Sequence, residues 1–99
     1  MKLISYTTKP GEAATNRAKI EAVFAALGDA QIADFAYMVV ETEPGEFFHI
    51  VEGTPAAFEA LQAIPAFHEF SSTARECQVA PSTRRDARII GSYGVPAQT

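Results

Sequence analysis

The sequence predicts a single α+β domain, residues 1–99, in which helices cover one face of an antiparallel sheet. Three observations lead to this prediction. The chain has 99 residues, of which 47% are hydrophobic and 20% charged, as in one small globular domain. Its apolar segments alternate between strand-like and helix-like patterns. Pro44-Gly45 lies between two strand-like segments, where it favours a hairpin.

The N-terminal part of the chain predicts a strand followed by a helix. Residues 2–8 are rich in β-branched and aromatic residues and end just before a Lys-Pro-Gly sequence that favours a loop. From residue 12 to residue 27 apolar residues recur with the spacing of one helical face. Gly28 is a favourable residue for the end of that helix.

Three more strands are expected in the rest of the chain. Residues 34–42 and 46–54 flank Pro44-Gly45 and should pair as an antiparallel hairpin. A final strand is predicted at residues 87–95, ARIIGSYGV, before a short polar tail.

A broken helix is expected between the hairpin and the last strand. Thr54 can cap its beginning, with Pro55 in the first helical position. Pro65 should interrupt the helix, because proline removes a hydrogen bond and clashes with the preceding turn, and a second segment should follow near 66–77. The inward side of this segment is predicted to be Phe67, Phe70, Ser71, Ala74 and Cys77.

The resulting order, βαββαβ, is that of the ferredoxin-like fold, with one antiparallel sheet and two helices on one face. The face of the sheet opposite the helices should also pack against another surface. Residues 37–40 and 47–51 are mostly apolar at successive positions, whereas a strand with one wet face alternates apolar and polar residues. A bare apolar face would favour aggregation, so a homodimer formed through this sheet face is expected.

Charge and cysteine content exclude several functional classes. A net charge of −4 argues against nucleic-acid binding, and the only basic doublet, Arg84-Arg85, is more readily a solvated loop. Cys77 is the only cysteine, so no internal disulfide can form. The N-terminus is too polar for a signal peptide, and no apolar run approaches the roughly 20 residues of a membrane span. We therefore expect a cytoplasmic protein with no membrane partner.

No cofactor and no metal site are predicted. The sequence has no glycine-rich phosphate loop, no G-x-S-x-G, no H-E-x-x-H and no Cys-x-x-Cys, and it lacks a Rossmann fingerprint and a haem attachment motif. His49 and His68 lie in different elements without a spacing typical of metal ligands.

Three blocks of the sequence carry a resemblance to a known group of proteins. YTTKPGEAATN, FFHIVE and IPAFHEFSSTARE, together with the βαββαβ order, resemble small bacterial members of the dimeric α/β-barrel superfamily, which includes antibiotic-biosynthesis-type monooxygenases. The superfamily also includes haem-degrading enzymes, isomerases and ligand-sensing domains. The haem-degrading branch relies on a Trp and on an Asn in the first strand. This chain has no Trp, and residues 2–8 contain no Asn, so that branch is set aside.

The resemblance also implies an assembly and a site. In the superfamily the sheets of two subunits pack face to face, and a small-molecule pocket lies between each sheet and its helices. The expected fold is therefore a dimeric α/β barrel with one pocket in each chain.

His49 is the main candidate for catalysis, and its position depends on the register of the hairpin. A two-residue turn or a four-residue loop would place His49 opposite Val40, whereas a three-residue loop at 43–45 would place it opposite Val39 on the side of Tyr37. A buried imidazole whose nitrogens are satisfied by protein groups would be structural. An imidazole in a pocket could instead remove a phenolic or α-carbonyl proton, since its ordinary pKa is near 6.5.

Further residues are candidates for ligand contact, each with a structural role as the alternative. Asn16 lies on the apolar side of the first predicted helix, where its amide must find partners. Tyr6 and Tyr37 are mid-strand aromatics whose hydroxyls could bind a polar ligand atom. His68 and Arg75 share a ridge that a bend in the helix could turn toward the pocket, where Arg75 offers a fork for a carboxylate. The predicted substrate-binding residues are Tyr6, Asn16, Tyr37, Phe67, His68, Phe70 and Arg75.

Two functions remain open at this point. The first is a small cofactor-independent monooxygenase or isomerase that acts on an aromatic or polyketide-like molecule. The second is a non-catalytic homodimeric domain that binds a small molecule or has only a structural role. An enclosed cavity reached by His49 or Tyr37 would favour the enzyme, and a filled interior would favour the non-catalytic domain.

Overall fold

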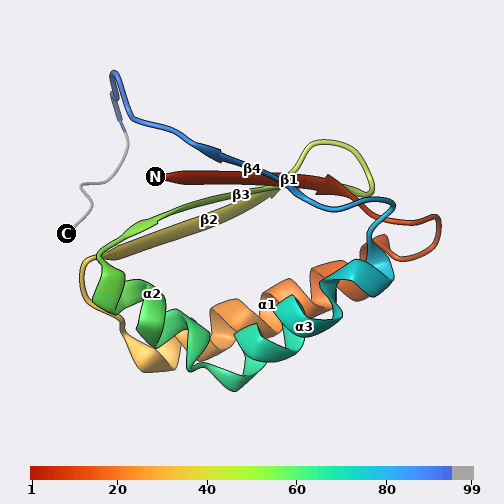
Figure 1. Ribbon diagram of the computed structural model, residues 1–99, viewed down its shortest axis with the longest axis horizontal. Helices are drawn as coiled ribbons and strands as arrows, with labels where there is room; N and C mark the ends of the chain where they lie inside the picture. The colour runs from red at the N-terminus through yellow and green to blue at the C-terminus, as the bar shows by residue number, and fades with distance from the viewer. Residues whose placement is uncertain (95–99) are drawn as a thin grey trace.

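The computed structural model describes residues 1–94, which form one antiparallel sheet with helices on one of its faces (Figure 1). The elements in chain order are β1 (Lys2–Thr7), α1 (Ala13–Ala30), β2 (Phe35–Glu41), β3 (Glu46–Gly53), α2 (Pro55–Gln62), α3 (Pro65–Cys77) and β4 (Thr83–Asp86). The strand order is β2-β3-β1-β4, and every neighbouring pair is antiparallel. This arrangement confirms the predicted α+β class and the ferredoxin-like fold.

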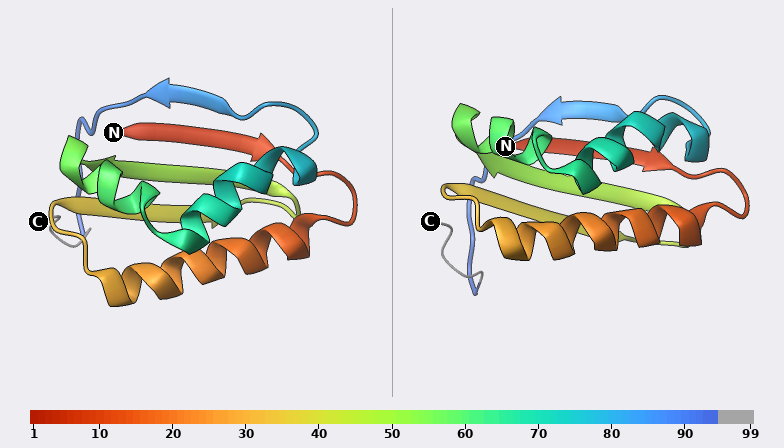
Figure 2. Two further views of the ribbon diagram at one scale, coloured as in Figure 1. Left: turned by 60° about the horizontal axis from the view of Figure 1, so that its bottom comes forward. Right: turned by 90° about the horizontal axis from the view of Figure 1, so that it is seen from below.

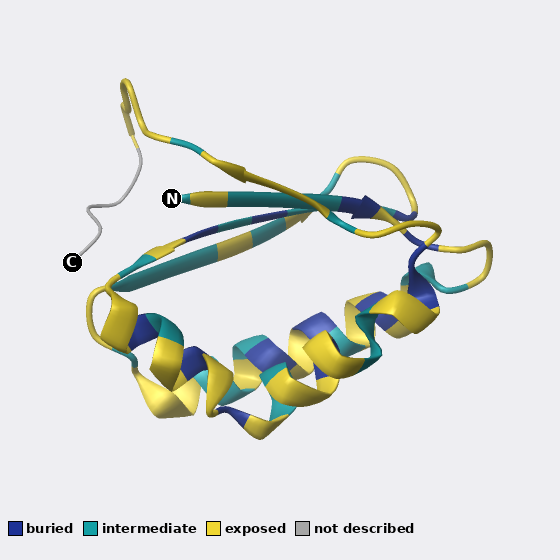
Figure 3. Ribbon diagram, viewed as in Figure 1, coloured by how far each residue is buried: buried dark blue, intermediate teal, exposed yellow. Residues whose placement is uncertain are grey.

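The helices form a single layer against the sheet. Figure 2 shows α1 running beside the β2 edge, while α2 and α3 follow one another across the same face. In Figure 3 the buried parts of the helices lie on the sides turned toward the sheet and toward each other. The centre of the core consists of Tyr6 and Phe47 from the sheet, Ile20 and Val23 from α1, and Phe70 from α3.

The hairpin between β2 and β3 adopts the register that follows from a three-residue loop. Thr42 N–H donates to Glu46 O over 3.1 Å, and Glu46 N–H donates to Glu43 O over 2.9 Å. Gly45 closes this turn with φ +96°, a conformation that glycine adopts without steric cost. His49 consequently lies opposite Val39 and faces the helices.

The face of the sheet without helices carries an apolar cluster together with several polar residues. The alternation of side chains along paired strands assigns to it the apolar Leu3, Ala36, Met38, Val40, Phe48 and Ile50, and also Ser5, Thr7, Glu46, Glu52, Thr83 and Arg85. Met38 is 53% exposed and Val40 is 41% exposed. The apolar residues expected on the second face are therefore present in the single chain.

The last strand differs from the prediction. A strand was expected at residues 87–95, but β4 is formed by Thr83–Asp86, and residues 87–94 form no helix or strand; residue 95 lies outside the described residues. The four residues of β4 are all exposed and pair with β1 at the edge of the sheet. Edge strands are often polar and charged, because their pairing depends on backbone hydrogen bonds rather than on burial. An ion pair between Lys2 and Asp86 joins the two strands.

The end of α1 also differs from the prediction. The helix continues past Gly28 to Ala30, and Gln31 ends it with φ 49° while its N–H donates to Leu27 O over 3.0 Å. An exposed glycine costs a helix only about 1 kcal/mol, so the hydrogen bonds of the last turn can outweigh it.

Pro65 divides the second helical region as predicted. α2 ends at Gln62, and α3 begins at Pro65 after Ile64, which has an extended backbone with ψ 121°. Thr54 caps α2, because its Oγ1 accepts a hydrogen bond of 3.1 Å from Ala57 N–H. The break lets α3 lie over β3 and β1, where it covers His49.

The Thr54 cap should contribute measurably to stability. We expect Thr54→Ala to lower the free energy of unfolding by about 1 kcal/mol, because one N–H group at the start of α2 loses its acceptor. Urea unfolding followed by circular dichroism measures this change. Thr54→Ser keeps the hydroxyl and should stay close to the wild type; an equal loss in both variants would contradict a capping role.

Candidate functional site

A cavity of about 180 Å³ lies between the sheet and α3. Its walls come from all four strands, from α3 and from the segment that follows α3. Six of the eight residues predicted from the sequence to form the site line it: Tyr6, Tyr37, His49, Phe67, Phe70 and Arg75. The interior beside His49 is therefore not completely filled by side chains.

A chain of buried hydrogen bonds forms one wall of this cavity. Tyr6 OH lies 2.7 Å from His49 Nε2, and Tyr37 OH lies 2.7 Å from His49 Nδ1. Asn16 Nδ2, from α1, donates to Tyr6 OH over 2.9 Å. The three strand residues come together because β3 lies between β1 and β2, and their side chains all face the helices.

The Asn16 amide, at one end of this series of hydrogen bonds, determines which group donates in each of the other bonds. Because the Asn16 amide donates to the oxygen of Tyr6, the O–H of Tyr6 needs another acceptor, and His49 Nε2 is within reach. The neutral imidazole then carries its proton on Nδ1 and donates it to the oxygen of Tyr37. The O–H of Tyr37 has no acceptor in this network, so it remains available to a molecule in the cavity.

Burial keeps the network uncharged at neutral pH. It lowers the pKa of His49 to about 4, and the positive charge of Arg84 acts in the same direction. Burial raises the pKa of Tyr6 to about 12 and raises the pKa of Tyr37 as well. The site therefore offers neutral hydrogen-bond donors and acceptors, and neither a phenolate nor a charged imidazole is present at pH 7.

Aromatic packing holds the imidazole in place. The ring of His49 stacks on Phe70 of α3, with ring centres 5.6 Å apart and planes 28° apart. Tyr6 stacks in the same way on Phe47, with centres 5.6 Å apart and planes 18° apart. The orientation of the hydrogen-bonded groups is thus fixed by the core rather than by flexible loops.

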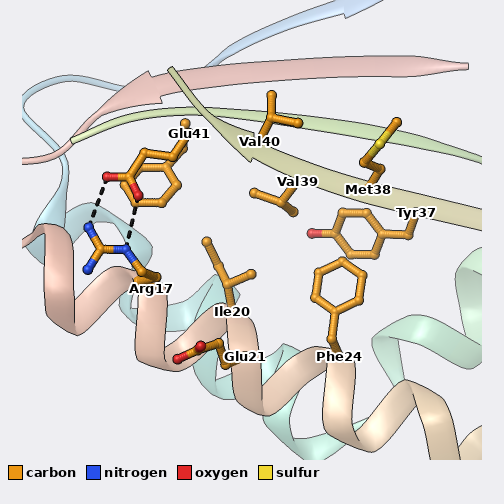
Figure 4. A pocket seen from close by; sticks show the side chains of 10 residues that line it. Arg17, Ile20, Glu21, Phe24, Tyr37, Met38, Val39, Val40 and Glu41 are labelled. Atoms are coloured by element: carbon orange, nitrogen blue, oxygen red, sulfur yellow. Dashed lines mark hydrogen bonds and ion pairs between the residues drawn. The ribbon is translucent and has the colours of Figure 1, made fainter. Parts of the chain in front are cut away.

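A larger cavity, of about 440 Å³, opens between α1 and the edge strand β2 (Figure 4). Its walls are mostly apolar, and Figure 4 shows Ile20 and Phe24 of α1 facing Val39 and Tyr37 of β2. Its main charged groups bind each other, because the Arg17 guanidinium donates to both oxygens of Glu41, over 3.0 and 3.1 Å. This cavity offers few free polar groups to a ligand, so the cavity beside His49 is the better candidate site.

No family model matches the chain, and no curated protein sequence matches it. Solved structures do. A provisionally assigned antibiotic biosynthesis monooxygenase from Bacteroides thetaiotaomicron superposes with a TM-score of 0.74 at 14% identity, over 98% of this chain and 93% of that one. The chain has the antibiotic-biosynthesis-monooxygenase-like fold.

Two further structures are similar to this monooxygenase-like fold. Another provisionally assigned antibiotic biosynthesis monooxygenase, from Caulobacter crescentus, has a TM-score of 0.67 at 12% identity, over 85% of this chain and 82% of that one. A protein of unknown function from Nitrosomonas europaea has a TM-score of 0.70 at 13% identity, over 97% of this chain and 92% of that one. The fold expected from the sequence blocks is therefore confirmed, and it occurs in proteins with and without an assigned activity.

Two of the predicted site residues lie outside the lining of the cavity beside His49. Asn16 is buried and contacts the site only through the hydroxyl of Tyr6. His68 is exposed and does not line this cavity, because the inward side of α3 passes through Phe67, Phe70 and Ala74. The bend at Pro65 therefore brings Arg75 to the cavity but leaves His68 in solvent.

Sequence reasoning missed four residues of the cavity wall, Ile4, Gln78, Ser82 and Arg84. Arg84 was interpreted as part of a solvated loop, but it lies in β4 opposite Ile4, on the side of the sheet that faces the helices. Gln78 follows α3 and is 4% exposed. The alternation of side chains along a strand could have indicated that Arg84 faces the helices, whereas no pattern in the sequence indicates that Gln78 lines the cavity.

The described part of the chain shows neither a metal site nor a membrane helix. Among residues 1–94, no group of three or more His, Cys, Asp or Glu side chains could hold a metal ion. No helix in the same range is long and apolar enough to cross a membrane.

The pKa of His49 makes stability depend on pH. Between pH 6.5 and about pH 4 the unfolded chain binds a proton at His49 that the folded protein does not bind. The stability that His49 contributes as a neutral group is therefore complete above pH 6.5 and is lost as the pH falls toward 4. When the pH falls from about 7.5 to about 5, we expect the free energy of unfolding of the wild type to decrease by roughly 2 kcal/mol more than that of His49→Gln, because glutamine does not titrate.

Urea unfolding of both proteins at several pH values measures this difference. Because the two chains have the same carboxylates, their other titrations cancel in the comparison. Parallel pH curves for wild type and His49→Gln would contradict a buried, neutral His49.

Proposed function

We propose that the protein binds a small aromatic or readily enolised molecule beside His49 and oxidises it with molecular oxygen, without a cofactor. The observation that carries this proposal is the hydroxyl of Tyr37, which ends a buried hydrogen-bond chain at the wall of a cavity lined with aromatic rings. The fold shared with provisionally assigned monooxygenases supports the reaction class.

The neutral network favours a substrate that supplies its own acidity. With a pKa of about 4, His49 is a weak base at pH 7. A phenol or a CH₂ group activated by a neighbouring carbonyl can lose its proton to solvent and bind as the anion. A hydrogen bond from Tyr37 O–H to the substrate oxygen would then stabilise the negative charge.

The oxidation then needs only the substrate anion and O₂. The anionic carbon transfers electrons to O₂ and forms a C–O bond, and the resulting peroxide takes up a proton. Loss of water from this hydroperoxide leaves a carbonyl. In total a CH₂ group and O₂ give C=O and H₂O, so the carbon loses four electrons and O₂ gains four. The role of the protein is to bind the anion, orient it and exclude water.

The alternative function is binding without catalysis. It is favoured by the complete pairing of the His49 ring, since both nitrogens already have tyrosine hydroxyls as partners. In this case Tyr6, His49 and Tyr37 would form a rigid polar core, and the cavity would only bind a ligand.

Oxygen uptake with an anthrone distinguishes the two functions. We expect the wild type to consume O₂ and form the quinone, and Tyr37→Phe to be slower by about 100-fold, because a single donor to a developing anion contributes a factor of this size. Phe keeps the ring, so the fold should remain intact in thermal unfolding. A ligand-induced spectral shift with no O₂ uptake above the protein-free rate would support binding alone.

We also propose that the protein acts as a homodimer in which the open faces of two sheets meet. The residues that support this are Met38 and Val40, both well exposed, and the apolar Leu3, Phe48 and Ile50 beside them. If ~500 Å² of this face were buried, the favourable hydrophobic free energy at ~25 cal/mol per Å² would be on the order of 12 kcal/mol before the cost of association.

Two valine substitutions separate the open face from the core. Val40→Asp should give a folded monomer, because it places a charge in the proposed contact. Val51→Asp should unfold the chain, because Val51 is 5% exposed and lies on the side of the helices. Light scattering and circular dichroism measure the two outcomes, with Val40→Ile as a control that should remain a dimer. A wild type that is monomeric at micromolar concentration would contradict the dimer.

A further inference from the structure

We propose that the ligand of the cavity beside His49 carries a carboxylate, which Arg75 and Arg84 bind, and a neighbouring hydroxyl or N–H group, which donates to Gln78. The inference deepens the proposed function, because it concerns the same cavity and names the class of molecule as an aromatic carboxylate. It concerns binding only and can be tested without turnover.

The wall of the cavity is positively charged. Arg75 and Arg84 are the charged residues among those that line it, and no Asp or Glu is among them. Within residues 1–94, the ion pairs join Lys2 to Asp86, Arg17 to Glu41 and the N-terminus to Glu52, so neither Arg75 nor Arg84 has a carboxylate within 4.0 Å. In a chain with a net charge of −4, two arginines without a partner at one cavity form a site for an anion.

The two arginines reach the cavity from different elements. Arg75 lies in the last turn of α3, and Arg84 lies in β4 opposite Ile4, so the two approach the cavity from the helix layer and from the sheet. Arg84 lines the same cavity as His49, and its positive charge acts with burial to lower the pKa of His49. A carboxylate bound there would lie beside the hydrogen-bond network.

An unsatisfied acceptor lies in the same wall. Gln78 is 4% exposed, and its Oε1 is buried without a hydrogen-bond partner. Buried polar atoms normally have partners, and an unpaired one lowers stability. A ligand hydroxyl or N–H group that reaches this amide would provide the missing donor, which a carboxylate alone cannot do.

The shape of the cavity suggests the rest of the molecule. Phe67 and Phe70 of α3 lie 6.3 Å apart, ring centre to ring centre, and both line the cavity. A volume of about 180 Å³ suits a compound with one aromatic ring. An adjoining cavity of about 290 Å³ also includes Ile4, Tyr37, Phe67 and Arg84 in its wall, and it leaves room for a substituent.

Calorimetric titration with salicylate and with its neutral amide, salicylamide, tests the inference. The two probes share the ring and the hydroxyl and differ in charge. We expect salicylate to bind at least about tenfold more tightly than salicylamide, because it can form charge-assisted hydrogen bonds with an arginine. Arg75→Gln and Arg84→Gln should each weaken the binding of salicylate by about tenfold and leave the affinity for salicylamide unchanged.

Two further variants complete the experiment. Arg88→Gln removes the same charge from an exposed position that lines neither cavity, and it should leave both affinities unchanged. Gln78→Met keeps the size of the side chain but removes the acceptor, so it should weaken both probes equally. Thermal unfolding confirms that each variant is folded.

Several results would overturn the inference. They are equal affinity for the two probes, unchanged salicylate binding in Arg75→Gln and Arg84→Gln, or no saturable binding of salicylate at millimolar concentration. Failure of the proposed oxidation looks different, because salicylate would still bind through both arginines while no aromatic substrate caused O₂ uptake.

Discussion

The pairing of one buried imidazole with two tyrosine hydroxyls constrains much of this structure. A neutral imidazole in the core needs one donor and one acceptor, and His49 finds them in Tyr6 and Tyr37, each 2.7 Å away. Both contacts require His49 to face the helices from the central strand β3, with β1 and β2 on either side. A hairpin loop one residue longer or shorter would put His49 and Tyr37 on opposite faces of the sheet and break the bond between them.

The same constraint shapes the chemistry that the site can perform. Since burial lowers the pKa of His49 to about 4, the imidazole is neutral at pH 7, and in the proposed function it holds Tyr37 in position with a free O–H. Acidity then has to come from the ligand. Arg75 and Arg84, which line the same cavity, would provide the positive charge that the proposed anionic ligand needs. In this proposal the neutral donors beside His49 and the two arginines bind one ligand.

Local signals in the sequence were sufficient for some elements and insufficient for others. Thr54, Pro55 and Pro65 predicted the break between α2 and α3, because capping and proline geometry depend on a few neighbouring residues. The hairpin register stayed open, since Pro44-Gly45 is compatible with several loop lengths. β4 was misplaced because pairing at a sheet edge depends on the partner backbone, which local hydrophobicity does not report. Arg84 and Gln78 were missed for the same reason: only the folded chain brings them to His49.

The most direct test of this account is the protonation state of His49 itself. Nitrogen-15 NMR of the imidazole ring, recorded from about pH 8 to about pH 5, distinguishes the charged ring from each neutral tautomer. The account predicts a neutral ring throughout this range, with the proton on Nδ1 and an unprotonated Nε2 that accepts from Tyr6. A ring that titrates near its ordinary pKa of about 6.5, or one that carries its proton on Nε2, would contradict it.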